Sequence, residues 1–124
     1  MERIIPIKNL SPFTATRARG QKAHLNLIEH LRGGESVILD LRCQELISMS
    51  FLDEIILSLK SLGSLEKVTF LFDDPVIHQR IARIAAFREA TIFYQSTESE
   101  QHKPIEPQPS PDLPVKPRKR AAGA

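Results

Sequence analysis

The chain has 124 residues, of which 41% are hydrophobic, and a formal net charge of +2. This length allows one domain, and the near-balanced charge argues against the strong positive excess that phosphate-driven nucleic-acid binding requires. Apolar residues concentrate in Met1–Ser96, whereas Thr97–Ala124 contains six prolines and only isolated apolar residues. We therefore expect a folded domain over residues 1–96 and a disordered, Pro-rich tail with a basic end over residues 97–124.

The first third of the chain predicts a strand, a helix and a second strand. Arg3–Ile7 is apolar and β-branched, and Pro6 places this strand at a sheet edge because proline cannot donate a ladder hydrogen bond. A helix is expected from Thr16, a good N-cap, to Gly33-Gly34. Val37–Leu41 is almost continuously apolar, as in a central strand that is covered on both faces.

The next segment predicts an amphipathic helix, two further strands and a third helix. Ser48 or Ser50 can cap the amphipathic helix, whose expected buried stripe is Leu52, Ile55, Ile56, Leu59 and Leu62. Lys67–Phe72 and Thr91–Tyr94 are β-prone runs, and a helix starting at Asp74-Pro75 and ending near Arg88 separates them. The order β-α-β-α-β-α-β indicates an α/β fold with a four-stranded, mainly parallel sheet and three helices.

Targeting and redox features favour a cytoplasmic protein. Cys43 is the only cysteine, so no intrachain disulfide can form. The first ten residues do not resemble a signal peptide, and no apolar run approaches the length of a membrane span.

Few residues form a pattern that predicts a metal, cofactor, catalytic or anion-binding site. The four histidines are not spaced like metal ligands, and no catalytic constellation or phosphate-binding loop is present, so we expect neither a metal nor another cofactor. Arg17 and Arg19 could bind an anion near a helix start, although a solvated basic face is the commoner use of such residues. Ser48 and Ser50 precede or open a helix, where serines usually serve as caps.

Two segments resemble a known family. The segment Val37–Leu41 (VILDL) is similar to the V-x-L-D-F strand of the bacterial STAS-like domains of unknown function, and Ser50–Glu54 (SFLDE) is similar to their S-F-x-D-E turn and helix. Thr16-Arg17 stands where these domains have a Ser-Arg dipeptide. More distantly, the chain resembles the STAS domains of anti-sigma-factor antagonists. Ser50 then aligns with their phosphorylated serine, while Met49 and Phe51 replace the neighbouring serine and glycine.

The resemblance implies a non-enzymatic regulatory module that binds a protein partner. The partner would be a histidine-kinase-type ATPase or an anti-sigma-like transcription regulator, docked at Ser48, Ser50, Phe51, Asp53 and Glu54, with Ser50 as a possible phosphorylation site. The alternative is a nucleic-acid-associated accessory protein that uses Arg17, Arg19 and the basic segment Lys116–Arg120.

Overall fold

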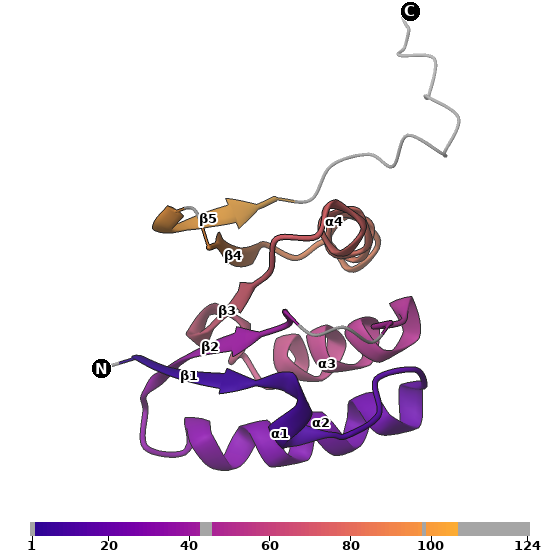
Figure 1. The fold of residues 1–124 in the computed structure, drawn as a ribbon. Coiled ribbons are helices and arrows are strands. Elements are labelled where there is room, and N and C mark those ends of the chain that lie inside the picture. Colours follow the sequence, from indigo (N-terminus) through magenta and orange to yellow (C-terminus); the bar gives the residue numbers. More distant parts are fainter. Residues whose placement is uncertain (1, 43–45, 98, 107–124) are drawn as a thin grey trace, which may run out of the picture.

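The computed structural model describes residues 2–42, 46–97 and 99–106 (Figure 1). Cys43 and Lys116–Arg120 lie outside these ranges. The described elements, in chain order, are β1 (Glu2–Pro6), α1 (Ile7–Leu10), α2 (Arg17–Leu31), β2 (Ser36–Asp40), α3 (Met49–Ser61), the 3-10 helix η1 (Leu65–Lys67), β3 (Val68–Leu71), α4 (Pro75–Arg88), β4 (Ile92–Ser96) and β5 (Ser99–Ile105).

The five strands form one sheet in the sequential order β1-β2-β3-β4-β5. The first four strands are parallel, and β5 returns antiparallel to β4. Sequential parallel strands joined by right-handed crossovers place all connecting helices on one face of the sheet. The expected α/β class with a mainly parallel sheet is therefore confirmed. Strand β2 was expected to be covered on both faces, but the helices of the described residues lie on one face of the sheet (Figure 1).

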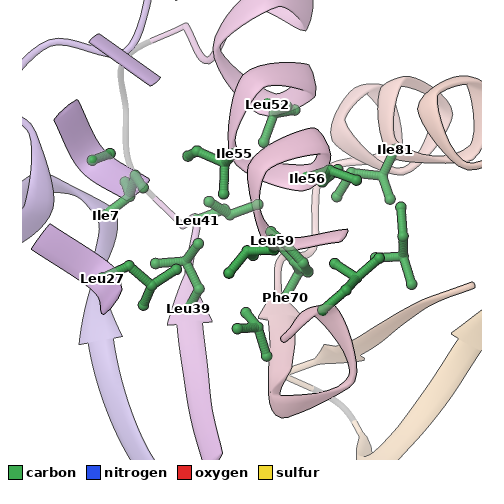
Figure 2. Close-up of a cluster of buried hydrophobic side chains, with 14 of the residues drawn as sticks. Ile7, Leu27, Leu39, Leu41, Leu52, Ile55, Ile56, Leu59, Phe70 and Ile81 are labelled. Carbon is green, nitrogen blue, oxygen red and sulfur yellow. The ribbon is translucent and has the colours of Figure 1, made fainter. Parts of the chain in front are cut away.

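The core lies between the sheet and the layer formed by α2, α3 and α4. Leu39 and Phe70, which are paired in register, point into this core together with Leu27 and Leu59 from the helices (Figure 2). All four side chains are completely buried. At roughly 1.5–3 kcal/mol for each fully buried large apolar side chain, this layer is the main source of stability.

Three expectations about the elements need correction. The segment expected to be disordered from Thr97 onward includes a strand, β5, because its backbone extends the sheet by pairing with β4. A short helix, α1, occupies residues expected to be strand end and loop. Leu62 is 58% exposed because α3 ends at Ser61, which leaves Leu62 at the C-cap and outside the buried stripe.

The predicted helix starts of α2 and α4 are confirmed. Thr16 caps α2 by accepting a hydrogen bond from the Arg19 amide, and Asp74 caps α4 by accepting one from the Val76 amide. Among the described residues, no helix is both long enough and apolar enough to cross a membrane.

Helices α2 and α3 approach each other closely at Gly20. A Cβ atom placed on Gly20 would lie 2.6 Å from the backbone oxygen of Phe51 and 3.0 Å from the Cβ of Glu54. One turn further along α2, His24 is buried, with 6% of its surface exposed. Burial lowers the pKa of this imidazole below its ordinary value, although the charge of Glu54 acts in the opposite direction.

Gly20→Ala should destabilise the protein, although alanine is the better helix former. The clash with the Phe51 backbone cannot be relieved by a side-chain rotation, and overpacking of this kind costs about 1–3 kcal/mol. The measurement is the free energy of unfolding by urea. Gly33→Ala is the matched control, because nothing lies within 4 Å of a Cβ placed there. Equal stability of the two variants would contradict the close approach.

His24 should make the protein less stable in mild acid. Below about pH 6.5 the unfolded state binds a proton on this imidazole that the folded state resists, so the free energy of unfolding falls as the pH falls. Unfolding measured at pH 7 and pH 5 should show a larger loss for the native chain than for His24→Leu. The same loss in both proteins would assign the pH dependence to other groups.

Candidate functional site

The predicted docking residues lie at the start of α3, but they differ sharply in exposure. Ser48 is the N-cap, and its hydroxyl accepts a hydrogen bond from the Phe51 amide at 3.1 Å. Ser50, the second residue of α3, is exposed. Phe51 is completely buried in the core, so a partner cannot contact its ring without opening the fold. Phe51 therefore has to be removed from the predicted docking surface.

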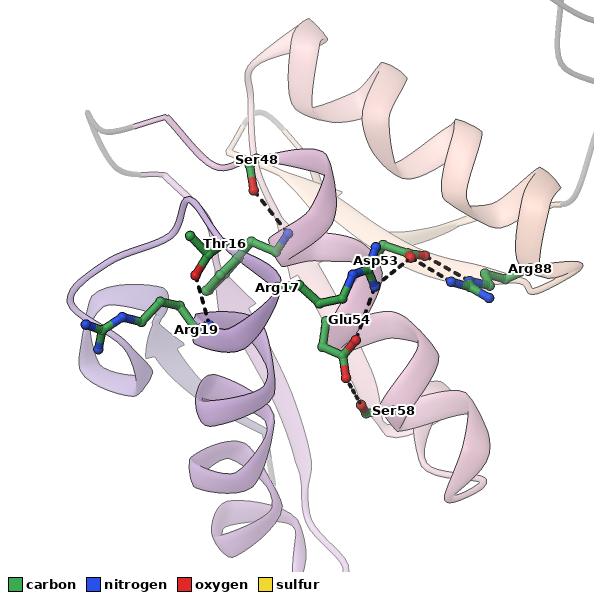
Figure 3. A network of polar contacts seen from close by, with 9 residues as sticks. Thr16, Arg17, Arg19, Ser48, Asp53, Glu54, Ser58 and Arg88 are labelled. Carbon is green, nitrogen blue, oxygen red and sulfur yellow. Dashed lines mark hydrogen bonds and ion pairs between the residues drawn. The ribbon is translucent and has the colours of Figure 1, made fainter.

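Asp53 and Glu54 are engaged within the protein. The Asp53 carboxylate accepts hydrogen bonds from Arg88 of α4 at 2.7 and 2.9 Å and from Arg17 of α2 at 3.0 Å (Figure 3). Arg17 also binds Glu54 at 3.1 Å, and Glu54 accepts a weaker bond from Ser58. These contacts join the three large helices through one carboxylate.

The Asp53 carboxylate remains ionised because of these partners. Its hydrogen bonds with Arg88 lower the pKa of Asp53, and those with Arg17 add to the effect against the opposing influence of burial. Because the pKa of Asp53 is lower in the folded than in the unfolded protein, its ionised carboxylate stabilises the fold at pH values above the ordinary carboxyl pKa of about 4. This stabilisation is lost progressively as the pH falls below that value. Near neutral pH Asp53 is therefore an ionised residue that stabilises the helix layer. It is not exposed as a contact for a partner, as the predicted docking surface assumed.

The two arginines of the predicted anion site point in different directions. Arg17 turns toward Asp53 and Glu54, whereas Arg19 extends away from them (Figure 3). The guanidinium of Arg19 stacks on Phe13, with 4.9 Å between its central carbon and the ring centroid. The structure therefore does not bring these arginines together as a pair, and two acids neutralise Arg17. This weakens the nucleic-acid alternative, which counted on both cations.

The loop before α2 is tied to the segment before α3. The Thr14 hydroxyl donates a hydrogen bond to the Leu46 carbonyl at 2.7 Å, and the Ser48 amide donates to the Thr14 carbonyl at 3.0 Å. Phe13 and Leu46 flank this junction, with 57% and 65% of their surfaces exposed. The exposed residues Phe13, Leu46 and Ser50, with the half-buried Arg19, together define what we call the α2/α3 surface.

A second polar cluster, not predicted from the sequence, lies at the carboxyl ends of the strands. Asp40 binds Arg42 through both carboxylate oxygens, and Arg42 Nη1 donates to the Thr97 hydroxyl at 3.0 Å. The amide and hydroxyl of Thr97 both donate to Asp73, which lowers the pKa of that carboxyl. Asp40 and Arg42 are neighbours in the chain, but Asp73 and Thr97 lie far from them and meet them only through the strand order.

Among residues 2–42, 46–97 and 99–106, no three His, Cys, Asp or Glu side chains gather closely enough to hold a metal ion.

Comparison with known proteins does not identify the chain: no protein family, curated protein or solved structure matches it.

Asp53→Asn should destabilise the protein by about 1.5–3 kcal/mol, because Arg88 loses its charged hydrogen-bond partner and Arg17, whose side chain is 48% exposed, keeps only Glu54. Urea unfolding at pH 7 measures the loss. Glu29→Gln is the control: its ion pair with Arg32 is exposed on both sides, and such pairs contribute less than about 1 kcal/mol. A similar small loss in both variants would rule out a structural role for the Asp53 network.

Proposed function

We propose that the chain is a non-enzymatic regulatory module of STAS-like type that docks a protein partner through the α2/α3 surface. The partner class is a histidine-kinase-type ATPase or an anti-sigma-like regulator. The observation that carries the proposal is the position of Ser50 within the SFLDE segment. Of the five predicted docking residues it is the exposed one, and it stands at the N-terminal turn of α3 beside the junction with the loop before α2.

The composition of the α2/α3 surface supports protein binding. Phe13 and Leu46 are large apolar side chains that are more than half exposed, and Arg19 lies over the Phe13 ring. Aromatic residues and arginine are enriched in protein interfaces because they combine a large contact area with hydrogen-bonding capacity. Ser50 adds a hydroxyl to this apolar and cationic surface.

Local electrostatics support Ser50 as a regulated serine. A phosphoryl group on Ser50 would stand at the N-terminal end of α3, where the helix dipole favours negative charge. Asp53 and Glu54 lie three and four residues further along the same helix and would oppose it. Arg17 and Arg88 offset much of that opposing charge, because they pair with these acids at 2.7–3.1 Å. Phosphorylation would change the charge of the surface without requiring a new fold.

Capture from the native host tests the docking proposal. The full-length tagged protein should retain an ATPase or a transcription regulator identified by mass spectrometry. Phe13→Ala and Ser50→Asp should each reduce recovery about tenfold, because losing one central contact in an interface costs about 1.4 kcal/mol or more.

Phe87→Ala is the matched control for Phe13→Ala. Phe87 is also exposed and also carries an arginine over its ring, Arg88 at 4.8 Å, but it stands at the C-terminal end of α4. Recovery that is unchanged in Phe13→Ala and Ser50→Asp, or equally reduced in Phe87→Ala, would refute the assigned surface. Phosphopeptide mapping of the recovered protein shows separately whether Ser50 carries phosphate.

A further inference from the structure

A pocket of about 510 Å³ opens where β2 and β3 end, between the segment that precedes α3 and the first turns of α4. Its floor is apolar and consists of Leu41, Ile47, Phe72 and Ile77, which are each at most 5% exposed. The carboxyl ends of parallel strands are the edge at which open α/β sheets bind ligands, and the volume suits a small molecule.

Charges of both signs stand around this apolar floor. Arg42 and Arg80 provide two cations, and Asp73 and Asp74 provide two exposed anions. Arg42 is also paired with Asp40 through Nε and Nη2, which offsets part of its charge. Arg42 and Asp73 are held close together because both bind the Thr97 hydroxyl, at 3.0 Å from Nη1 and 2.6 Å from Oδ2. Arg80 is held in place because its Nη1 donates to the Ile47 carbonyl at 2.5 Å.

This arrangement restricts the chemistry of the ligand. A simple anion would be attracted by Arg80 but repelled by Asp73 and Asp74, because Asp40 already offsets the charge of Arg42. A simple cation would be attracted by the two aspartates but repelled by Arg80. An uncharged apolar molecule would cover the floor but would exclude water from the exposed carboxylates of Asp73 and Asp74 without offering them a cation, which is unfavourable. A small zwitterion with an apolar body meets all three constraints.

We propose that the pocket binds an α-amino acid with an apolar side chain. Its ammonium group faces Asp73 and Asp74, its carboxylate faces Arg42 and Arg80, and its side chain lies on the floor formed by Leu41, Ile47, Phe72 and Ile77. The short separation of the ammonium and carboxylate groups suits the close placement of Arg42 and Asp73. This ligand site goes beyond partner docking and needs neither Ser50 nor Phe13.

Titration of the full-length protein with L-leucine, followed by amide NMR, tests the proposal. Saturable shifts should appear at Phe72 and Ile77. N-acetyl-L-leucine lacks the ammonium and L-leucinamide lacks the carboxylate, so each should bind about tenfold more weakly, as expected for the loss of a hydrogen bond to a charged group. Glycine, which lacks the apolar body, should also bind more weakly.

Single substitutions test the contributions of the aspartates and of the arginines around the pocket separately. Asp73→Asn should weaken L-leucine about tenfold but leave N-acetyl-L-leucine unchanged, and Arg80→Gln should weaken L-leucine but leave L-leucinamide unchanged. Glu66→Gln and Arg32→Gln change exposed charges away from the pocket and should bind L-leucine like the native chain.

Three results would overturn the amino-acid site. The first is the absence of saturable shifts at Phe72 and Ile77 at any soluble concentration of L-leucine. The second is equal binding of L-leucine, N-acetyl-L-leucine and L-leucinamide, which would show that only the apolar floor contributes. The third is that Asp73→Asn and Arg80→Gln behave like the two control variants.

Discussion

The helix layer depends on the ion pairs that the carboxylate of Asp53 makes with two arginines. This carboxylate lies on α3 and binds Arg17 of α2 and Arg88 of α4, so the three helices that cover the sheet share one buried anion. Gly20 complements this network by letting α2 reach the α3 backbone, where any larger side chain would clash with Phe51. Ion pairing and close approach together fix the spacing of the layer above its apolar core.

This constraint determines which residues can act at the surface. Because Asp53, Glu54 and Arg17 satisfy one another, their charges stabilise the fold and are less available to a ligand or partner. Phe51 anchors the start of α3 in the core. Ser50 is left exposed, two residues after Ser48, whose amide binds the loop before α2 at Thr14. The proposed docking surface therefore consists of residues that the packing of α3 does not use.

The two proposed sites share one structural origin. In a sheet with sequential parallel strands, every strand ends at the same edge, and each following helix begins there. The start of α3 thus contributes to both the α2/α3 surface and the pocket, with Leu46 at their boundary. The charged side chains around the pocket come from the ends of β2 and β3 and from α4, whereas the docking surface depends on α2 and α3.

Local sequence signals predicted most of the elements. Thr16, Asp74 and Pro75 mark helix starts through their own side chains and rings, so the starts of α2 and α4 could be predicted from neighbouring residues alone. Strand β5 could not, because Ser99–Ile105 is polar and contains Pro104, and it becomes a strand only by pairing with β4. Leu62 was wrongly expected in the buried stripe of α3, because the apolar spacing continues to Leu62 although the helix stops at Ser61.

The sequence by itself determined the α/β class, the buried stripe of α3 up to Leu59 and the position of Ser50 at a helix start, because hydrophobic period and capping act over a few neighbouring residues. Only the tertiary structure decided how the charges are used. Arg17 and Asp53 are 36 residues apart, and Asp53 and Arg88 are 35 apart, so no local pattern could reveal that they form one network. The local pair Asp40–Arg42 likewise meets Asp73 and Thr97 only because β2, β3 and β4 end side by side.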